Sequence, residues 1–289
     1  NSVTCVGQNN GSISLTTTGT GPFTYAWTPN VGTGATVNNL APGSYSVVIR
    51  DVNGCSTSAS YTINPATPLT ASSTATNVRC YNGNTGSATI SSSGGVGPYT
   101  YQWSPSGGTN ATANNLTAGN YSVTITDSRG CTTLSTVNIT QPPQLIATIQ
   151  NTVNPSCNGG SNGSASVSVT GGTTPYASYI WSPSGFSGPN ATGLSAGPQT
   201  VTITDASGCT NTVGIALSNP PVVTATIVNP LLPSCNGSTD GSLSATPGGG
   251  SGTGYTYSWS PMGGTSSTAT NLGTGTYTVT IRDSRGCSA

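Results

Sequence analysis

Charged side chains are scarce in this 289-residue chain, which has neither histidine nor lysine nor glutamate. Five arginines and five aspartates are its only charged residues, and the net charge is zero. General acid–base catalysis near neutral pH relies mostly on His, Glu, Lys or Cys. We therefore expect no enzyme, no catalytic residue and no cofactor.

The chain also lacks a basic region and a long apolar run. Ten dispersed charges provide no positive face for phosphate, so we expect no nucleic-acid partner. The most apolar stretch, residues 222–232, is interrupted by Thr, Asn and Pro. It is shorter than the ~18 residues that a membrane helix requires, and we expect no membrane span in this sequence.

What the chain does have is a fourfold internal repeat. Tryptophan recurs every 76 to 78 residues, at Trp27, Trp103, Trp181 and Trp259. Short Pro-containing linkers at 64–68, 141–143 and 219–221 separate the copies and are expected to be semi-rigid. The expected domains are 1–64 (repeat 1, leading strand missing), 69–140 (repeat 2), 144–218 (repeat 3) and 222–289 (repeat 4, trailing strand missing).

Within each copy the alternation of side chains predicts antiparallel strands and no helix. In repeat 2, Tyr121, Val123 and Ile125 alternate with Ser and Thr, and Tyr99, Tyr101 and Trp103 share one face of an earlier strand. A Trp on a middle strand and an L-x-x-G-x-Y corner favour an all-β array of four immunoglobulin- or fibronectin-like sandwiches, with a barrel as the weaker alternative.

Repeat 3 departs from this pattern. It has Gln199 where the other copies have Tyr45, Tyr121 and Tyr277. We expect its corner to be the least well fixed of the four.

The repeated order Cys, Asn/Gly turn, P-Y/F-x-Y-x-W and L-x-x-G-x-Y-x-V-x-I-x-D-x-x-G-C resembles the SprB-type repeat of giant surface adhesins from gliding bacteria. The resemblance covers essentially the whole chain. It implies a very long, secreted, surface-anchored repeat protein that acts as a filament or adhesin, and it names no ligand.

Each copy has two cysteines, giving Cys5, Cys55, Cys80, Cys131, Cys157, Cys209, Cys235 and Cys287. With no C-x-x-C and no His, a metal site is not expected, and the even count indicates disulfides and an oxidising compartment. Pairing within a copy, Cys5 to Cys55 and onward, is favoured because a small sandwich core needs a staple. Pairing across a linker, as in Cys55 to Cys80, stays open.

An aspartate recurs in the D-x-x-G-C segments, as Asp51, Asp127, Asp205 and Asp283. Calcium needs six to eight oxygen ligands, usually with several carboxylates, and each copy offers little beyond this one side chain. We therefore expect each carboxylate to accept backbone N–H groups of its turn.

Aromatic pairs on the Trp strand suggest two alternatives. The Trp rings, with Tyr25, Tyr101, Tyr179 and Tyr257, are expected in the core. If exposed, Trp27, Trp103, Trp181 and Trp259 could instead stack on carbohydrate.

So uncharged a surface has little repulsion against lateral association, which predicts covalent glycans. The candidate acceptors are Thr36, Thr112, Thr192 and Thr270, placed at matching positions, and Asn110 and Asn190 in N-x-S/T triplets. The sequence as a whole favours a structural repeat region of an extracellular filament or surface stalk. The alternative is an adhesin that binds surface polysaccharide; expected partners are copies of itself or neighbouring repeats, and glycans.

Overall fold

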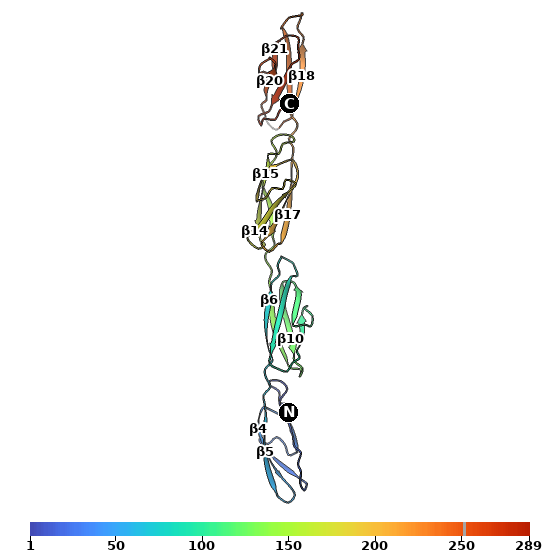
Figure 1. The fold of residues 1–289 in the computed structure, drawn as a ribbon, viewed down its shortest axis with the longest axis vertical. Coiled ribbons are helices and arrows are strands. Elements are labelled where there is room, and N and C mark those ends of the chain that lie inside the picture. Colours follow the sequence, from blue (N-terminus) through green and yellow to red (C-terminus); the bar gives the residue numbers. More distant parts are fainter. Residues whose placement is uncertain (251–252) are drawn as a thin grey trace. The chain divides into compact units, whose positions relative to one another are not determined.

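A computed structural model describes residues 1–250 and 253–289, which form twenty-two β-strands and no helix (Figure 1). The chain divides into two compact units, Asn1–Gln141 and Pro142–Ala289. Each unit contains two of the four sequence repeats and the hydrophobic core of each of those repeats. The exact repeat boundaries stay a prediction.

Repeat 2 has two three-stranded antiparallel sheets. One has the order β6-β7-β9, and the other has the order β11-β10-β8. The strand bounds are β6 Thr70–Thr76, β7 Gly86–Ser93, β8 Thr100–Ser104, β9 Thr112–Leu116, β10 Gly119–Thr126 and β11 Thr132–Ile139. This is the sandwich arrangement in which the Trp strand, β8, pairs with the strand that follows the Tyr corner, β10.

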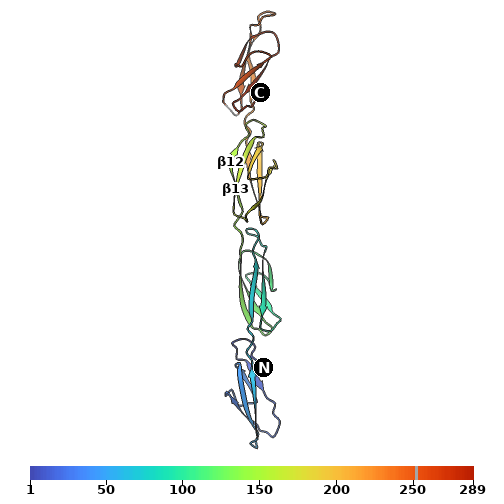
Figure 2. The same ribbon diagram turned by 60° about the vertical axis from the view of Figure 1, so that its left-hand side comes forward.

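Repeat 3 has the same two sheets, β12-β13-β15 and β14-β16-β17. Strands β12 and β13 lie side by side in antiparallel pairing (Figure 2). The bounds are β12 Ile146–Val153, β13 Gly163–Thr170, β14 Tyr176–Ser182, β15 Asn190–Leu194, β16 Gly197–Asp205 and β17 Thr210–Leu217.

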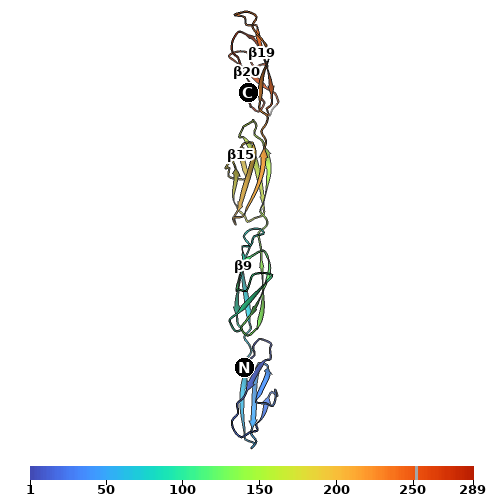
Figure 3. The same ribbon diagram turned by 90° about the vertical axis from the view of Figure 1, so that its right-hand side faces the viewer.

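Repeats 1 and 4 have five strands each in the described residues. Repeat 1 has sheets β1-β3 and β2-β4-β5, without a counterpart of β6, and its strands are β1 Gly11–Ser14, β2 Thr24–Thr28, β3 Thr36–Leu40, β4 Gly43–Arg50 and β5 Ser56–Ile63. Repeat 4 has sheets β18-β19-β21 and β20-β22, without a counterpart of β11 among the described residues. Figure 3 labels one strand of each sheet, β19 and β20. Its strands are β18 Thr224–Leu231, β19 Gly241–Gly248, β20 Thr256–Ser260, β21 Thr268–Leu272 and β22 Thr278–Arg282.

The core of each repeat lies between its two sheets. On β10, Tyr121, Val123 and Ile125 are buried, as the alternation predicted, and they form one cluster with Trp103 of β8 and Leu116 of β9. Burying such large apolar side chains is the main favourable term in so small a sandwich. The all-β, immunoglobulin-like fold class is therefore confirmed, and the barrel alternative is wrong.

Candidate functional site: the cysteine loops of the repeats

The second cysteine of each repeat ends a short turn that we call the trailing hairpin, the D-x-x-G-C segment at 51–55, 127–131, 205–209 and 283–287. In repeat 2 the Asp127 Oδ1 accepts the backbone N–H groups of Arg129 and Cys131, each at 2.9 Å. Its Oδ2 accepts the N–H of Val96 at 2.9 Å. The carboxylate therefore fixes the hairpin that carries the cysteine, as expected for this motif.

These hydrogen bonds also decide the charge state of the buried aspartates. Burial raises the pKa of the Asp127 carboxyl, but three backbone N–H groups and the nearby Arg129 guanidinium together lower that pKa below its usual value. For Asp205, burial likewise raises the pKa, and backbone N–H groups led by that of Thr173 outweigh it. Both carboxylates are thus held ionised as acceptors for the backbone.

The first cysteine of each repeat opens a second turn, the leading loop, at 5–10, 80–85, 157–162 and 235–240. The residue before each cysteine donates its backbone N–H to the side chain six positions later. These acceptors are Asn10 at 2.9 Å, Thr85 at 2.8 Å, Asn162 at 2.9 Å and Asp240 at 3.0 Å. We did not predict this closure of the loop from the sequence. A signal for it exists, because a polar residue recurs directly before the glycine that begins β1, β7, β13 and β19.

Disulfides join the leading loop of one repeat to the trailing hairpin of the next. Cys5 is bonded to Cys131, with Cα atoms 5.5 Å apart, and Cys157 is bonded to Cys287, with Cα atoms 5.4 Å apart. Cys80 and Cys209 are also disulfide-bonded. Cys55 and Cys235 are free and exposed.

This pairing corrects both sequence-based alternatives, since Cys5 is not bonded to Cys55 and Cys55 is not bonded to Cys80. The reason is the position of the two cysteines along strand β11. The leading loop of repeat 2 lies at the end of that strand, where the Asn82 N–H donates to Gln141 Oε1 at 2.7 Å. Cys131 directly precedes its start, and eight strand residues extend about 25 Å, whereas disulfide-bonded Cα atoms lie about 5–6 Å apart.

In unit 1 the disulfide lies in a hollow with a volume of about 430 Å³. It is lined by residues of the leading loop, the linker and the trailing hairpin: Cys5, Val6, Gln8, Thr67, Pro68, Leu69, Gly130, Cys131 and Thr132. The Cys131 Sγ lies 3.2 Å from the carbonyl oxygen of Thr4, and the Cys287 Sγ lies 3.2 Å from that of Ser156. These two disulfides therefore share a contact with the carbonyl of the residue before the leading-loop cysteine.

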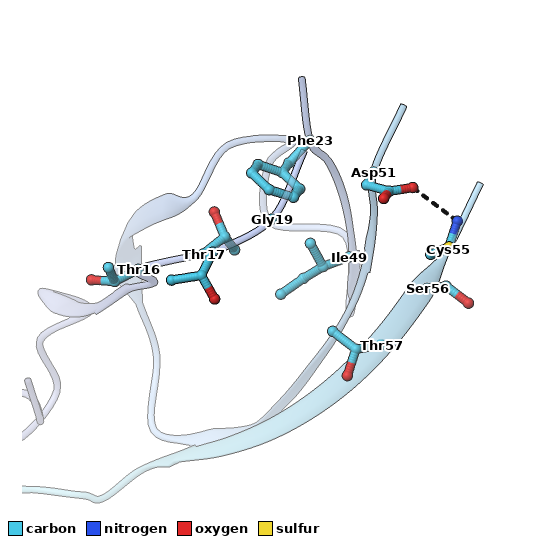
Figure 4. Close-up of a pocket in the computed structure, with 10 residues that line it drawn as sticks. Thr16, Thr17, Gly19, Phe23, Ile49, Asp51, Cys55, Ser56 and Thr57 are labelled. Carbon is cyan, nitrogen blue, oxygen red and sulfur yellow. Dashed lines mark hydrogen bonds between the residues drawn. The ribbon is translucent and has the colours of Figure 1, made fainter. Parts of the chain in front are cut away.

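A different hollow opens beside the free Cys55, with a volume of about 360 Å³ (Figure 4). Phe23, Ile49 and Asp51 line it together with the Thr16–Thr18 segment. In repeats 3 and 4 the corresponding corner contains a buried Leu145 or Val223 from the segment before the first strand. Cys55 itself is exposed.

The four tryptophans are buried, with at most 6% of each residue exposed. Each Nε1–H donates to a backbone carbonyl seven residues later: Trp27 to Gly34, Trp103 to Asn110, Trp181 to Gly188 and Trp259 to Ser266. The core interpretation of these rings is correct, and Trp27, Trp103, Trp181 and Trp259 offer no face for carbohydrate stacking.

The candidate glycosylation residues lie on or beside the equivalent strands β3, β9, β15 and β21 of the four repeats. Thr36, Thr192, Thr270, Asn110 and Asn190 are exposed, and Thr112 is half-buried. Thr36, Thr112, Thr192 and Thr270 were expected at equivalent positions of the four repeats, and this expectation is wrong. Thr36 and Thr112 pair with Ser14 and Thr89, and the equivalent pairs elsewhere are Asn190 with Ser166 and Thr268 with Ser244; Thr192 and Thr270 lie two residues further along their strands.

No group of three or more His, Cys, Asp or Glu side chains in the described ranges 1–250 and 253–289 is placed to hold a metal ion. Over the same ranges no helix is long and apolar enough to cross a membrane.

Strand order, buried Trp and Tyr corner together define a tandem array of immunoglobulin-like β-sandwich repeats. The model of the SprB repeat matches four segments, residues 1–32, 72–108, 149–186 and 224–264, together about half of the chain. This chain belongs to the SprB repeat family. No curated protein matches it.

Several solved structures resemble the chain weakly. Three N-terminal domains of the bacteriophage RB49 Highly Immunogenic Outer Capsid protein are 19% identical, with 67% of this chain and 75% of that chain covered and a TM-score of 0.35. Sidekick-1 immunoglobulin domains 1–5 are 11% identical over 98% and 76%, with a TM-score of 0.28. Surface layer protein SbsC, domains 1–6, is 15% identical over 90% and 48%, with a TM-score of 0.23. The fold assignment depends on the strand order rather than on these neighbours.

Proposed function

We propose that this chain is a non-catalytic, structural repeat region of an extracellular filament or surface stalk, in which disulfides carry load between neighbouring repeats. The observation that supports the proposal is the pairing itself, Cys5 to Cys131 and Cys157 to Cys287. Disulfides persist in oxidising environments outside the cytosol, which favours an extracellular location.

The pairing determines which parts of the chain bear tension. When the two ends of the chain are pulled apart, the force passes from Cys5 through the disulfide to Cys131. The residues between these two cysteines therefore carry no tension. The bonds enclose sequence separations of 126 and 130 residues. A disulfide within each repeat would protect one sandwich but would leave every linker to bear the force, whereas Cys5–Cys131 and Cys157–Cys287 bypass the linkers at 64–68 and 219–221. Bonds between repeats suit a stalk that must not lengthen.

Single-molecule pulling on the 289-residue chain tests this proposal. With disulfides intact, we expect extension of little more than the chain ends and the residues between Cys131 and Cys157. Reduction should release the two enclosed segments, about 870 Å of extended chain at ~3.4 Å per residue.

The chain offers a matched pair of variants for the same measurement. Cys131→Ser should extend further than the unaltered chain and less than the reduced chain. Cys55→Ser, which changes the equivalent but free cysteine, should extend like the unaltered chain. Equal extension of the oxidised and reduced chains would contradict a load-bearing role.

We also propose that glycans cover this surface. Only 3% of the residues are charged, and surfaces without charge repulsion associate laterally through exposed β-strands. The exposed Asn110, Asn190, Thr36 and Thr192 are accessible acceptors. Intact-mass measurement on native material should show mass above that of the disulfide-bonded polypeptide, and a bare mass would contradict glycosylation.

A further inference from the structure

The two free cysteines lie in turns that are built like those of the bonded cysteines. Asp51 Oδ1 accepts the N–H groups of Asn53 and Cys55, each at 2.9 Å, as Asp127 Oδ1 does for Arg129 and Cys131. The backbone that presents the Cys55 thiol therefore matches the backbone that presents Cys131 to its partner.

Cys235 shows the same correspondence on the other side of the bond. The Ser234 N–H donates to Asp240 Oδ1 at 3.0 Å, and the Ser238 N–H donates to the Cys235 carbonyl at 3.0 Å. In the bonded leading loop, the Ser156 N–H donates to Asn162 Oδ1 at 2.9 Å. Both free thiols are thus held in turns that form disulfides elsewhere in the same molecule.

The bonded pairs also show a fixed polarity. Cys5 and Cys157 belong to leading loops, whereas their partners Cys131 and Cys287 belong to trailing hairpins. Cys55 is in a trailing hairpin and Cys235 is in a leading loop. The two free cysteines are therefore complementary to each other, and neither is complementary to itself.

Both thiols are exposed and accessible to the cysteine turn of another repeat. The Cys55 residue borders the hollow that Phe23 and Asp51 line (Figure 4).

We propose that Cys55 and Cys235 form the same kind of disulfide between repeats, each with the complementary turn of another repeat: Cys55 with a leading-loop cysteine and Cys235 with a trailing-hairpin cysteine. A second copy of this chain provides both turns, so Cys235 of one copy should bond to Cys55 of another, head to tail. The partner is thus the cysteine turn of another repeat of the same kind. The assignment deepens the proposed stalk function, on which its biological role rests, while its chemistry requires only the pairing rule.

The oxidant is a small-molecule disulfide such as oxidised glutathione. A protein thiolate attacks one of its sulfur atoms, forms a mixed disulfide and releases one glutathione thiol. The second protein thiolate then attacks the protein sulfur of that mixed disulfide and releases the second glutathione. Two protein thiols and one oxidised glutathione give one protein disulfide and two glutathione thiols, so atoms and electrons balance.

Two variants of the whole chain, Cys55→Ser and Cys235→Ser, test the pairing in a glutathione redox buffer that leaves the native disulfides intact. Each variant alone has one free cysteine of one type and should stay monomeric on a non-reducing gel. Their mixture should form a dimer, at least about tenfold above either variant alone, and should stop there. The unaltered chain should form a ladder.

Peptide mapping of the mixed dimer should give one new linked pair, Cys235 with Cys55. Dimers of either single variant at the yield of the mixture would overturn the proposal, because they require pairing of like turns. A mixture that remains monomeric or capped by glutathione would also overturn it. The pulling experiment on the monomer is independent of this result, so a failed cross-link leaves the load-bearing proposal standing.

Discussion

Repeats 2 and 3 have the same strand order but different buried residues at the start of β10 and β16, where the chain turns the corner into the strand. In repeat 2 the Tyr121 hydroxyl donates to the Thr117 carbonyl at 3.1 Å. In repeat 3 the Gln199 Nε2–H donates to the Ser195 carbonyl, also at 3.1 Å. The corner therefore requires a donor to the carbonyl four residues earlier, and an amide can supply it as well as a phenol can.

The two corners differ in whether a buried polar atom remains without a hydrogen-bond partner. Gln199 is 1% exposed, and its Oε1 has no hydrogen-bond partner among the described residues. A tyrosine leaves no second polar atom. Since a buried unsatisfied acceptor costs about 1–3 kcal/mol, repeat 3 should keep the geometry of the corner at a lower stability.

The largest expected effect tests whether the rest of the two cores is equivalent. Trp103→Ala and Trp181→Ala should each cost about 3–5 kcal/mol, because each removes a buried indole and leaves a cavity. Amide hydrogen exchange of the whole chain, read by mass spectrometry of peptides from each repeat, measures the loss locally. Gln102→Ala, an exposed change on the Trp103 strand, is the control. A loss below 1 kcal/mol in either repeat would break the comparison.

An exchange of the corner residues isolates the difference between the repeats. Gln199→Tyr should stabilise repeat 3 by about 1–3 kcal/mol, because it removes the unpaired acceptor, and Tyr121→Gln should destabilise repeat 2 by a similar amount. The same hydrogen-exchange measurement applies. Tyr121→Phe, which loses only the hydroxyl, should cost about 1 kcal/mol. Destabilisation of repeat 3 by Gln199→Tyr would show that the pocket is shaped for the amide.

These comparisons show which features were predictable from the sequence. Side-chain alternation predicted the buried face of β10, because residues two apart along a strand share a face. The D-x-x-G-C spacing predicted that Asp127 accepts backbone N–H groups, because such bonds are local. The corner of repeat 3 was expected to be the least fixed, yet its hydrogen bond is retained, since only the donor and not the ring is required.

Long-range pairing was not predictable. In a periodic array several pairings of leading and trailing cysteines have similar spacings, and only the placement of Cys80 and Cys131 at opposite ends of β11 excludes closure within a repeat. The register of Thr192, in contrast, was predictable from the sequence: Asn190 follows Trp181 by the same spacing as Thr36 follows Trp27, and Thr192 lies two residues further along β15.

The smallest expected effect concerns the trailing hairpins, where Asp127 has the Arg129 guanidinium nearby and Asp205 has Ser207 at that position. Both pKa values are below the usual value in the folded chain. The carboxylates therefore stabilise the fold fully above the unfolded pKa of ~3.9, and this stabilisation is lost as the pH falls through the lower folded pKa. Unfolding free energy should decrease as acid is added below about pH 4.

Arg129→Ala sharpens this last comparison. Removing the guanidinium should raise the pKa of the Asp127 carboxyl toward its usual value, and should leave the pKa of Asp205 unchanged, because Asp205 is held by backbone N–H groups. NMR titration of the side-chain carboxyl carbons measures both groups in one sample. Added salt should produce the same change at Asp127 by screening the charge. If the pKa of Asp127 did not change after the substitution, its low pKa would be due to the backbone N–H groups alone, as for Asp205 in repeat 3.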